Sequence, residues 1–259
     1  MDEKSRNFKI ETPHNSIHLV YSGRCLELRG RDKSLQSVIN LEAPERLELA
    51  NLRYMMSVLL FMPPPRRILL LGTAAGSLLH FLRHHYPGAM ISAVDIDAEL
   101  IRELLELQIL PPADERLDYV FDDAARYIEH CDRQFDLVLV DVFHGAQSPA
   151  WLLGRTTTQR LYELTAARGA LACNLLIDSE HEFRNFYREL RLRFGGNALS
   201  LPVAGLENRV VYAVRDPGPA DDMPANMEKA MKLSAQLDID LMPILSVIYN
   251  TNPAGDGLI

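Results

Sequence analysis

Between residues 67 and 214 the chain alternates apolar runs with amphipathic segments, and this alternation limits the possible fold more than any other feature. The run Arg67-Ile-Leu-Leu-Leu71 is almost entirely apolar, which is typical of a strand buried on both faces. The small residues 72–77 then lead into a helix that is expected to end near His85. Because strands separated by helices join through right-handed crossovers, the pattern predicts an α/β domain with a parallel sheet covered on both sides. Further strands are expected at 90–94, 117–121, 135–140, 169–176, 198–201 and 209–214.

The flanking segments predict smaller additions to this domain. Residues 8–30 alternate polar and apolar side chains around a Ser22-Gly23 turn, which predicts an antiparallel hairpin. A helix is expected from Pro44 to Met62, where three consecutive prolines end it. After Arg215 a linker leads to a tail with expected helices. The predicted division is an N-terminal β-hairpin region over 1–40, the α/β domain over 41–215, and a linker and helical tail over 216–259, with helices at 226–236 and 243–249.

Charge and cysteine usage exclude several classes of function. The net charge is −8 and no block of Lys or Arg occurs, so binding to nucleic acid or to an anionic membrane is disfavoured. Cys25, Cys131 and Cys173 have no metal-ligand spacing, which predicts no metal site and a reducing, cytoplasmic location. The first ten residues are charged and lack an apolar core, so no secretory leader is expected.

The turn Gly72-Thr-Ala-Ala-Gly-Ser77 follows the first buried strand and opens a helix. Small residues such as Gly72 and Gly76 let a ligand approach the backbone, and the helix N-terminus offers unpaired amides. Ala74 stands where dinucleotide-binding turns usually have a glycine, so the motif also fits a plain tight turn.

Carboxylates follow the next two expected strands. Asp95 comes about 20 residues after the glycine turn, where a carboxylate can accept hydrogen bonds from both hydroxyls of a ribose. Asp97 is expected to cap the next helix. Asp122 and Asp123 end the third strand, where a carboxylate can accept from the exocyclic amine of adenine, or can equally act as a helix cap. Together these strand ends predict a nucleoside site.

Asp141 ends the fourth strand of this set and reaches the same edge of the sheet. A carboxylate there can deprotonate an amine or hold a cation. His144 follows three residues later, and a histidine can act as a base near neutral pH, although a lone loop histidine is more often a surface residue.

At this point the chain resembles the spermidine synthases, or polyamine aminopropyltransferases. The shared segments are the Arg67–Ser77 strand and turn, Val94-Asp-Ile-Asp, Asp122-Asp-Ala, Phe135-Asp-Leu-Val-Leu-Val-Asp and Gln159-Arg-Leu-Tyr-Glu-Leu, in the same order. The segment from Gln36-Ser37 to Leu-Arg53-Tyr-Met is similar to a divergent bacterial group, the spermidine synthase-like proteins. The resemblance implies a Rossmann-like S-adenosylmethionine-dependent methyltransferase fold with a small N-terminal β-domain, a small-molecule substrate and a homodimer.

The resemblance also assigns individual residues. It implies that S-adenosylmethionine or its decarboxylated form is the donor, that Asp141 is the catalytic base, and that His144 and Gln36 lie on the substrate side. The donor-binding positions it implies are Gly72, Gly76, Asp95 and Asp123.

Three positions depart from the family. His144 replaces the second aspartate of the family's D-x-x-D pair, Ala75 replaces an aspartate in the glycine turn, and Ala50-Asn51-Leu52 replaces a segment that ends in glutamate. The nucleoside site is therefore better preserved than the polyamine site. Three functions stay compatible with the sequence: aminopropyl transfer to an amine, methyl transfer from S-adenosylmethionine, and adenosyl binding without catalysis.

Overall fold

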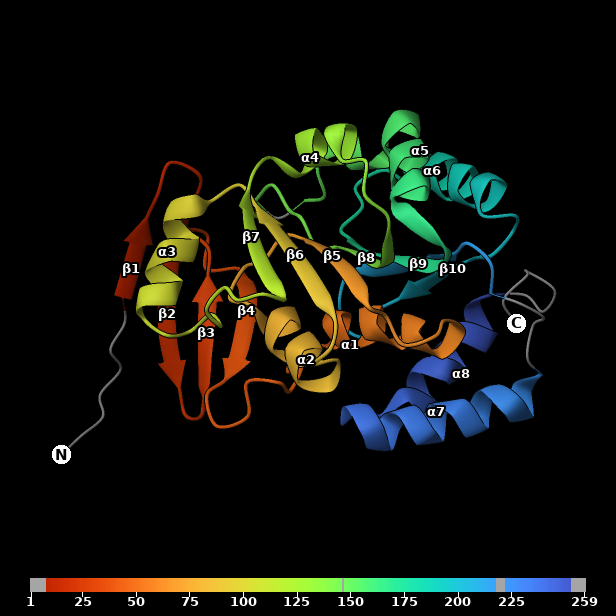
Figure 1. The fold of residues 1–259 in the computed structure, drawn as a ribbon, viewed down its shortest axis with the longest axis horizontal. Coiled ribbons are helices and arrows are strands. Elements are labelled where there is room, and N and C mark those ends of the chain that lie inside the picture. Colours follow the sequence, from red (N-terminus) through yellow and green to blue (C-terminus); the bar gives the residue numbers. More distant parts are fainter. Residues whose placement is uncertain (1–7, 146, 218–221, 253–259) are drawn as a thin grey trace.

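A seven-stranded sheet forms the centre of the protein (Figure 1). The computed structural model describes residues 8–145, 147–217 and 222–252. The strands lie in the order β10-β11-β9-β8-β5-β6-β7. Their bounds are β5 Arg67–Leu71, β6 Met90–Asp95, β7 Leu117–Phe121, β8 Phe135–Val140, β9 Thr165–Leu175, β10 Ala198–Pro202 and β11 Arg209–Val214.

The five strands β5 to β9 are parallel, as the alternation with helices predicts. The prediction of a parallel sheet is wrong for the last strand, because β11 runs antiparallel to both β9 and β10. The reason lies in the connection between β10 and β11, which is a short turn over 203–208 closed by a hydrogen bond from Val203 N to Asn208 O (2.9 Å). A turn of this length joins antiparallel neighbours, whereas a parallel pair needs a long crossover.

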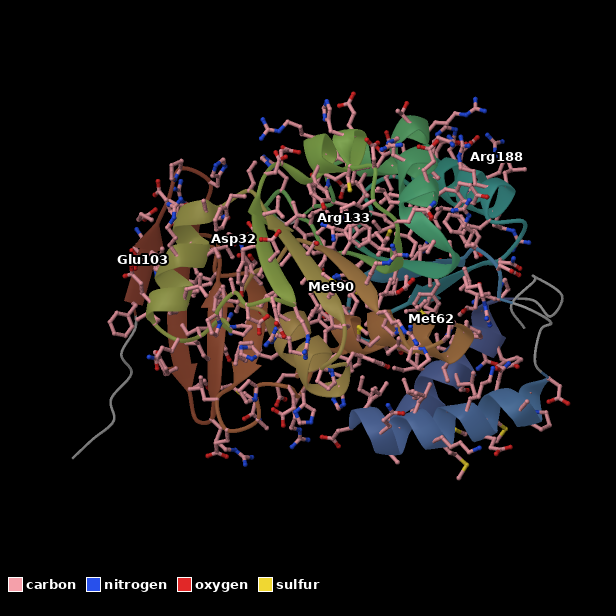
Figure 2. The ribbon with its side chains drawn as sticks, viewed as in Figure 1. Asp32, Met62, Met90, Glu103, Arg133 and Arg188 are labelled. Atoms are coloured by element: carbon pink, nitrogen blue, oxygen red, sulfur yellow. The ribbon has the colours of Figure 1, made fainter. Side chains whose placement is uncertain are left out.

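Helices cover both faces of the sheet and bury two separate apolar clusters (Figure 1). Beneath one face, as drawn, lie α1 (Ala50–Met56), the 3₁₀ helix η1 (Ser57–Phe61), α2 (Ser77–His85), α7 (Met223–Leu237) and α8 (Leu241–Thr251). On the opposite face lie α4 (Ala124–His130), the 3₁₀ helix η2 (Ala150–Leu153), α5 (Arg155–Leu164) and α6 (Glu180–Arg193). Charged side chains point outward, as Figure 2 shows for Glu103 and for Arg188 on α6.

The helix predicted from Pro44 begins later, at Ala50. Local hydrogen bonds explain the difference. The side chain of Asn40 accepts from the amides of Glu42 and Ala43 (both 3.1 Å), and Arg46 N donates to Ala43 O (3.0 Å). These turns occupy backbone groups that a helix would need, since a side-chain acceptor competes with helical pairing.

The predicted N-terminal hairpin is part of a larger, four-stranded antiparallel sheet. Its strands are β1 (Phe8–Glu11), β2 (Ser16–Ser22), β3 (Cys25–Arg29) and β4 (Leu35–Asn40). The sheet is attached to α3 (Ala98–Glu106) through Asp97, which caps that helix as predicted by accepting from Leu100 N (3.0 Å). The second oxygen of Asp97 accepts from Thr12 Oγ1 (2.6 Å) and Asn15 Nδ2 (2.7 Å). One buried carboxylate therefore joins the two sheets of the protein.

The C-terminal helices α7 and α8 pack against each other, and α8 also packs against β10. Asn252 closes this contact, since its side chain accepts from Ser200 N (3.0 Å) and donates to Ser200 O (3.2 Å). Parts of the predicted linker and tail, 218–221 and 253–259, lie outside the described residues. Within the described ranges, every helix is too short or too polar to cross a bilayer.

Candidate functional site

The carboxyl ends of four neighbouring strands bring the predicted site residues to one edge of the sheet. In spatial order these are Asp122 and Asp123 after β7, Asp95 at the end of β6, Gly72 after β5, and Asp141 after β8. From β5 the chain continues to β6 and β7 on one side, and it later fills the other side with β8 and β9. Ligands of open α/β sheets bind at such a switch point, outside the carboxyl ends of the strands.

The glycine turn requires both of its glycines. Gly72 has φ +87°, and a Cβ added there would lie 2.3 Å from the carbonyl oxygen of Asp141. Gly76 has φ +83°, and a Cβ there would lie 2.3 Å from Cδ2 of Leu110. The helix α2 then begins at Ser77 without a side-chain cap. The turn thus holds the backbones of β5 and β8 in contact directly below the candidate site.

We expect Gly72→Ala to damage both the fold and the site. The added methyl group would collide with the Asp141 backbone and would place alanine in a left-handed conformation, so the melting temperature should fall by about 5–10 °C. Scanning calorimetry measures the fall in melting temperature, and isothermal titration with methylthioadenosine measures the loss of binding. Gly88→Ala is the matched control, because nothing lies within 4 Å of its added Cβ. Equal melting temperatures for the two variants would contradict the close approach at Gly72.

Asp95 is half-buried at the end of β6, and its carboxylate holds two amides of the neighbouring backbone. Oδ2 accepts from Thr73 N (2.8 Å), and Oδ1 accepts from Asp97 N (2.9 Å). Burial raises the pKa of this carboxyl, and hydrogen bonds from the amides of Asp97, Thr73 and Ala74 oppose that effect. A carboxylate can accept further hydrogen bonds, so these oxygens stay available to ribose hydroxyls.

Thr73 lies in the glycine turn, and its buried hydroxyl has no hydrogen-bond partner among the described residues. A buried hydroxyl without a partner is destabilising. A polar group of a bound ligand would satisfy it, which agrees with a ligand held between this turn and Asp95.

Asp123 is exposed, and its side chain caps α4 by accepting from Ala125 N (2.7 Å). The capping alternative is therefore realised, and the adenine-side role of Asp123 stays a prediction. Asp122 forms an ion pair with Arg126, and its amide donates to Asp95 O (3.1 Å).

Asp141 is half-buried, and burial raises the pKa of its carboxyl to about 6. Asn174 Nδ2 donates to Asp141 Oδ1 (2.8 Å), and Asn208 Nδ2 donates in turn to Asn174 Oδ1 (3.0 Å). Sequence reasoning missed both asparagines. The available signal is Asn174 itself, an amide in the otherwise apolar segment Gly169-Ala-Leu-Ala-Cys-Asn-Leu-Leu.

The two residues predicted on the substrate side have no side-chain bond to Asp95 or Asp141 in the part of the chain that the structure describes. His144 is exposed on the loop after β8, and its amide donates to Gln147 O (2.8 Å). Gln36 lies on the exposed face of β4, while the next residue, Ser37, is buried and contacts Ser77 of α2 (3.1 Å between hydroxyl oxygens). Their roles stay predictions. The described residues contain no group of three or more His, Cys, Asp or Glu side chains that could hold a metal ion.

Comparison with known proteins agrees with this architecture. Residues 50–164 match the spermine/spermidine synthase domain. This chain is therefore similar to the spermidine synthases. It is 25% identical over 240 residues to the polyamine aminopropyltransferase of Chromobacterium violaceum, covering 91% of this chain and 90% of that protein. A probable spermidine synthase from Corynebacterium glutamicum has a similar structure, with a TM-score of 0.75 at 19% identity over 88% of this chain and 86% of that one. Human methyltransferase-like protein 13 in complex with SAH has a TM-score of 0.60 at 21% identity, covering 73% and 89%.

The structure also locates the three departures from the spermidine synthases. Ala75 is fully buried in the glycine turn, and Leu52 is buried in the core that α1 forms. His144 is exposed on its loop. None of these three positions supplies a carboxylate, and the role of Asp141 as the catalytic base stays a prediction.

Proposed function

We propose that this protein transfers an aminopropyl group from decarboxylated S-adenosylmethionine to an amine. One observation carries the proposal: the half-buried carboxyl of Asp141 lies at the end of β8 directly beside the glycine turn, against which its own backbone packs. The positive sulfonium of the donor makes the adjacent carbon electrophilic. The amine nitrogen attacks that carbon, the carbon–sulfur bond breaks, and methylthioadenosine leaves with the electron pair. The amine proton passes to Asp141, whose pKa of about 6 suits a base near neutral pH.

Binding of an S-adenosyl nucleotide is the first part of the proposal. The acceptor oxygens of Asp95 and the unpaired hydroxyl of Thr73 support it, and the similar human protein is in complex with SAH. A thermal-shift panel tests it, because a ligand that binds only the folded state raises the melting temperature. We expect methylthioadenosine and decarboxylated S-adenosylmethionine to raise it most. No increase with any adenosyl compound would overturn the proposal.

Methyl transfer is the second candidate, and Ala75 favours it. The carboxylate that the family has at this position is replaced by a buried methyl group, so a donor that keeps its own carboxylate meets less repulsion there. Larger thermal shifts with S-adenosylmethionine and S-adenosylhomocysteine would favour this alternative. Mass spectrometry of the modified amine decides between the two, since an aminopropyl group and a methyl group add different masses.

The homodimer that the resemblance implies stays a prediction, which static light scattering tests by measuring the mass of the protein in solution. The outer helix α7 exposes an apolar stripe at intervals of four residues, which gives such a contact a candidate surface. Its members are Met223, Met227 and Met231.

We expect putrescine to be a poor acceptor for this protein. A diamine presents two ammonium groups, and each needs a compensating partner once it leaves water. His144 stands where the family has a carboxylate, and a protonated histidine repels an ammonium. His144→Asp should lower the KM for putrescine about two- to fivefold, a modest gain because the position is exposed. The measurement is spermidine formation from decarboxylated S-adenosylmethionine and putrescine.

His14→Asp is the matched control for this variant, because His14 is an exposed histidine on the N-terminal sheet region. It makes the same charge change away from β8 and should leave the KM unchanged. Efficient spermidine formation by the unmodified protein would contradict the importance given to His144.

A further inference from the structure

Three polar side chains form a continuous hydrogen-bonded line at the edge of the sheet. Asn208 Nδ2 donates to Asn174 Oδ1 (3.0 Å), and Asn174 Nδ2 donates to Asp141 Oδ1 (2.8 Å). We propose that Asn174 and Asn208 are positioning residues that hold the Asp141 carboxyl in its ionised, proton-accepting form. The inference rests on the proposed function, in which Asp141 is the base.

The sheet itself builds this line. Val140 of β8 pairs with Cys173 of β9, so the next residues on the two parallel strands, Asp141 and Asn174, come side by side. Arg209 of β11 pairs with Leu175 of β9, which brings the preceding residue, Asn208, to the same end of β9. Asn174 is fully buried, and Asn208 is anchored because its carbonyl closes the β10–β11 turn.

The chemistry of the three groups sets the direction of the line. An ionised carboxylate only accepts hydrogen bonds, so Asn174 must turn its NH₂ toward Asp141 and its carbonyl toward Asn208. Asn208 then has to present its own NH₂. Asn208 thereby stabilises the orientation of Asn174 that favours ionised Asp141 over the protonated acid.

Other influences on Asp141 come from a small set of groups. Burial and the Asn174 hydrogen bond are the two effects that act on its pKa, in opposite directions. The titratable or charged groups at neighbouring strand ends are Asp95 on β6, which lies beyond β5, exposed His144 after β8, and the Arg209–Glu180 ion pair beside β9 and β11 (3.0 Å). Within the described part of the chain, none of them has a hydrogen bond or ion pair with Asp141, so the asparagine line is its direct polar contact.

The experiment measures the pKa of Asp141 directly, by ¹³C NMR titration of the carboxyl carbons in protein labelled at aspartate. The Asp141→Asn spectrum assigns the signal. Asn174→Leu removes the donor, so we expect the pKa to rise from about 6 to about 7 or above. Asn208→Asp places an acceptor where a donor is needed and should raise it as well, because Asn174 must then turn its NH₂ away from Asp141. Asn208→Ala should give a smaller rise.

Turnover gives a second readout that a merely structural role would not produce. A pKa near 7 lowers the ionised fraction of Asp141 about fivefold at pH 6 and leaves it nearly unchanged above pH 8. The variants should therefore lose turnover at pH 6 and recover it at pH 8, measured with saturating amine. A merely structural defect would lower turnover by the same factor at every pH.

Asn185→Asp is the matched control, because Asn185 is an exposed asparagine on α6. It adds the same charge as Asn208→Asp and should leave the pKa of Asp141 unchanged. An unchanged pKa in the Asn208 variants, which keep the buried Asn174, would overturn the inference even if Asn174→Leu fails to fold. If the pKa moves but Asp141→Asn retains full turnover, the asparagine line is real but Asp141 is not the base of the proposed reaction.

Discussion

Asp141→Asn should lose transferase turnover by a factor of about 10²–10⁴ while keeping its affinity for methylthioadenosine. The amide cannot accept the amine proton, which removes the base from the proposed reaction. In the proposed function the donor nucleoside contacts Asp95 and the glycine turn instead, and the substitution leaves both intact. Initial rates with decarboxylated S-adenosylmethionine and the best amine of a panel measure the first effect, and isothermal titration measures the second.

The same variant should be more stable than the parent at neutral pH. Burial raises the pKa of Asp141 to about 6 from an ordinary value of 3.8, so the folded state binds this proton more tightly than the unfolded chain does. The ionised carboxylate therefore lowers the free energy of unfolding increasingly between about pH 4 and pH 6, by about 3 kcal/mol in full. An asparagine at this position does not ionise, so the variant does not lose this stability. Its melting temperature should therefore exceed that of the parent above pH 6, and the two melting temperatures should converge near pH 4.

Asp132→Asn provides the control for both readouts. Asp132 is exposed near the opposite end of β8, so its amide variant should match the parent in turnover and in melting temperature. Parent-like turnover in Asp141→Asn would place the base elsewhere. If the difference in melting temperature between Asp141→Asn and the parent is the same at every pH, Asp141 does not have the raised pKa that burial gives it.

Asp95→Ala should weaken methylthioadenosine binding more than a hundredfold while the protein stays folded. Two hydrogen bonds from ribose hydroxyls to a charged acceptor contribute about 1.5–3 kcal/mol each, and about 1.4 kcal/mol corresponds to a factor of ten. Alanine removes both acceptors and also releases the amides of Thr73 and Asp97. Isothermal titration gives the affinity, and circular dichroism confirms the fold.

Asp118→Ala is the matched control, because Asp118 is exposed on the neighbouring strand β7, below its carboxyl end. It makes the same charge change and should leave binding unchanged. Asp95→Asn should lie between parent and alanine, since the amide keeps one acceptor oxygen. Equal affinity in the parent and Asp95→Ala would remove Asp95 from the nucleoside site.

The apolar runs and the small-residue turn determined the central architecture by themselves. A strand such as Arg67–Leu71 is buried on both faces, and that burial leaves a continuous apolar run in the sequence. The order of strand ends likewise places Asp95 and Asp141 at one edge, because parallel strands joined by helices all point the same way. These features depend on local pattern and chain direction, so the sequence alone predicts them.

Long-range contacts decided the rest. The late start of α1 depends on turns that the Asn40 side chain stabilises. The antiparallel direction of β11 depends on the short turn that pairs it with β10. The line from Asn208 through Asn174 to Asp141 joins residues 33 and 34 positions apart in the chain. Hydrogen bonds of this kind leave no periodic pattern in the sequence, because strand register in three dimensions, and not spacing along the chain, brings the partners together.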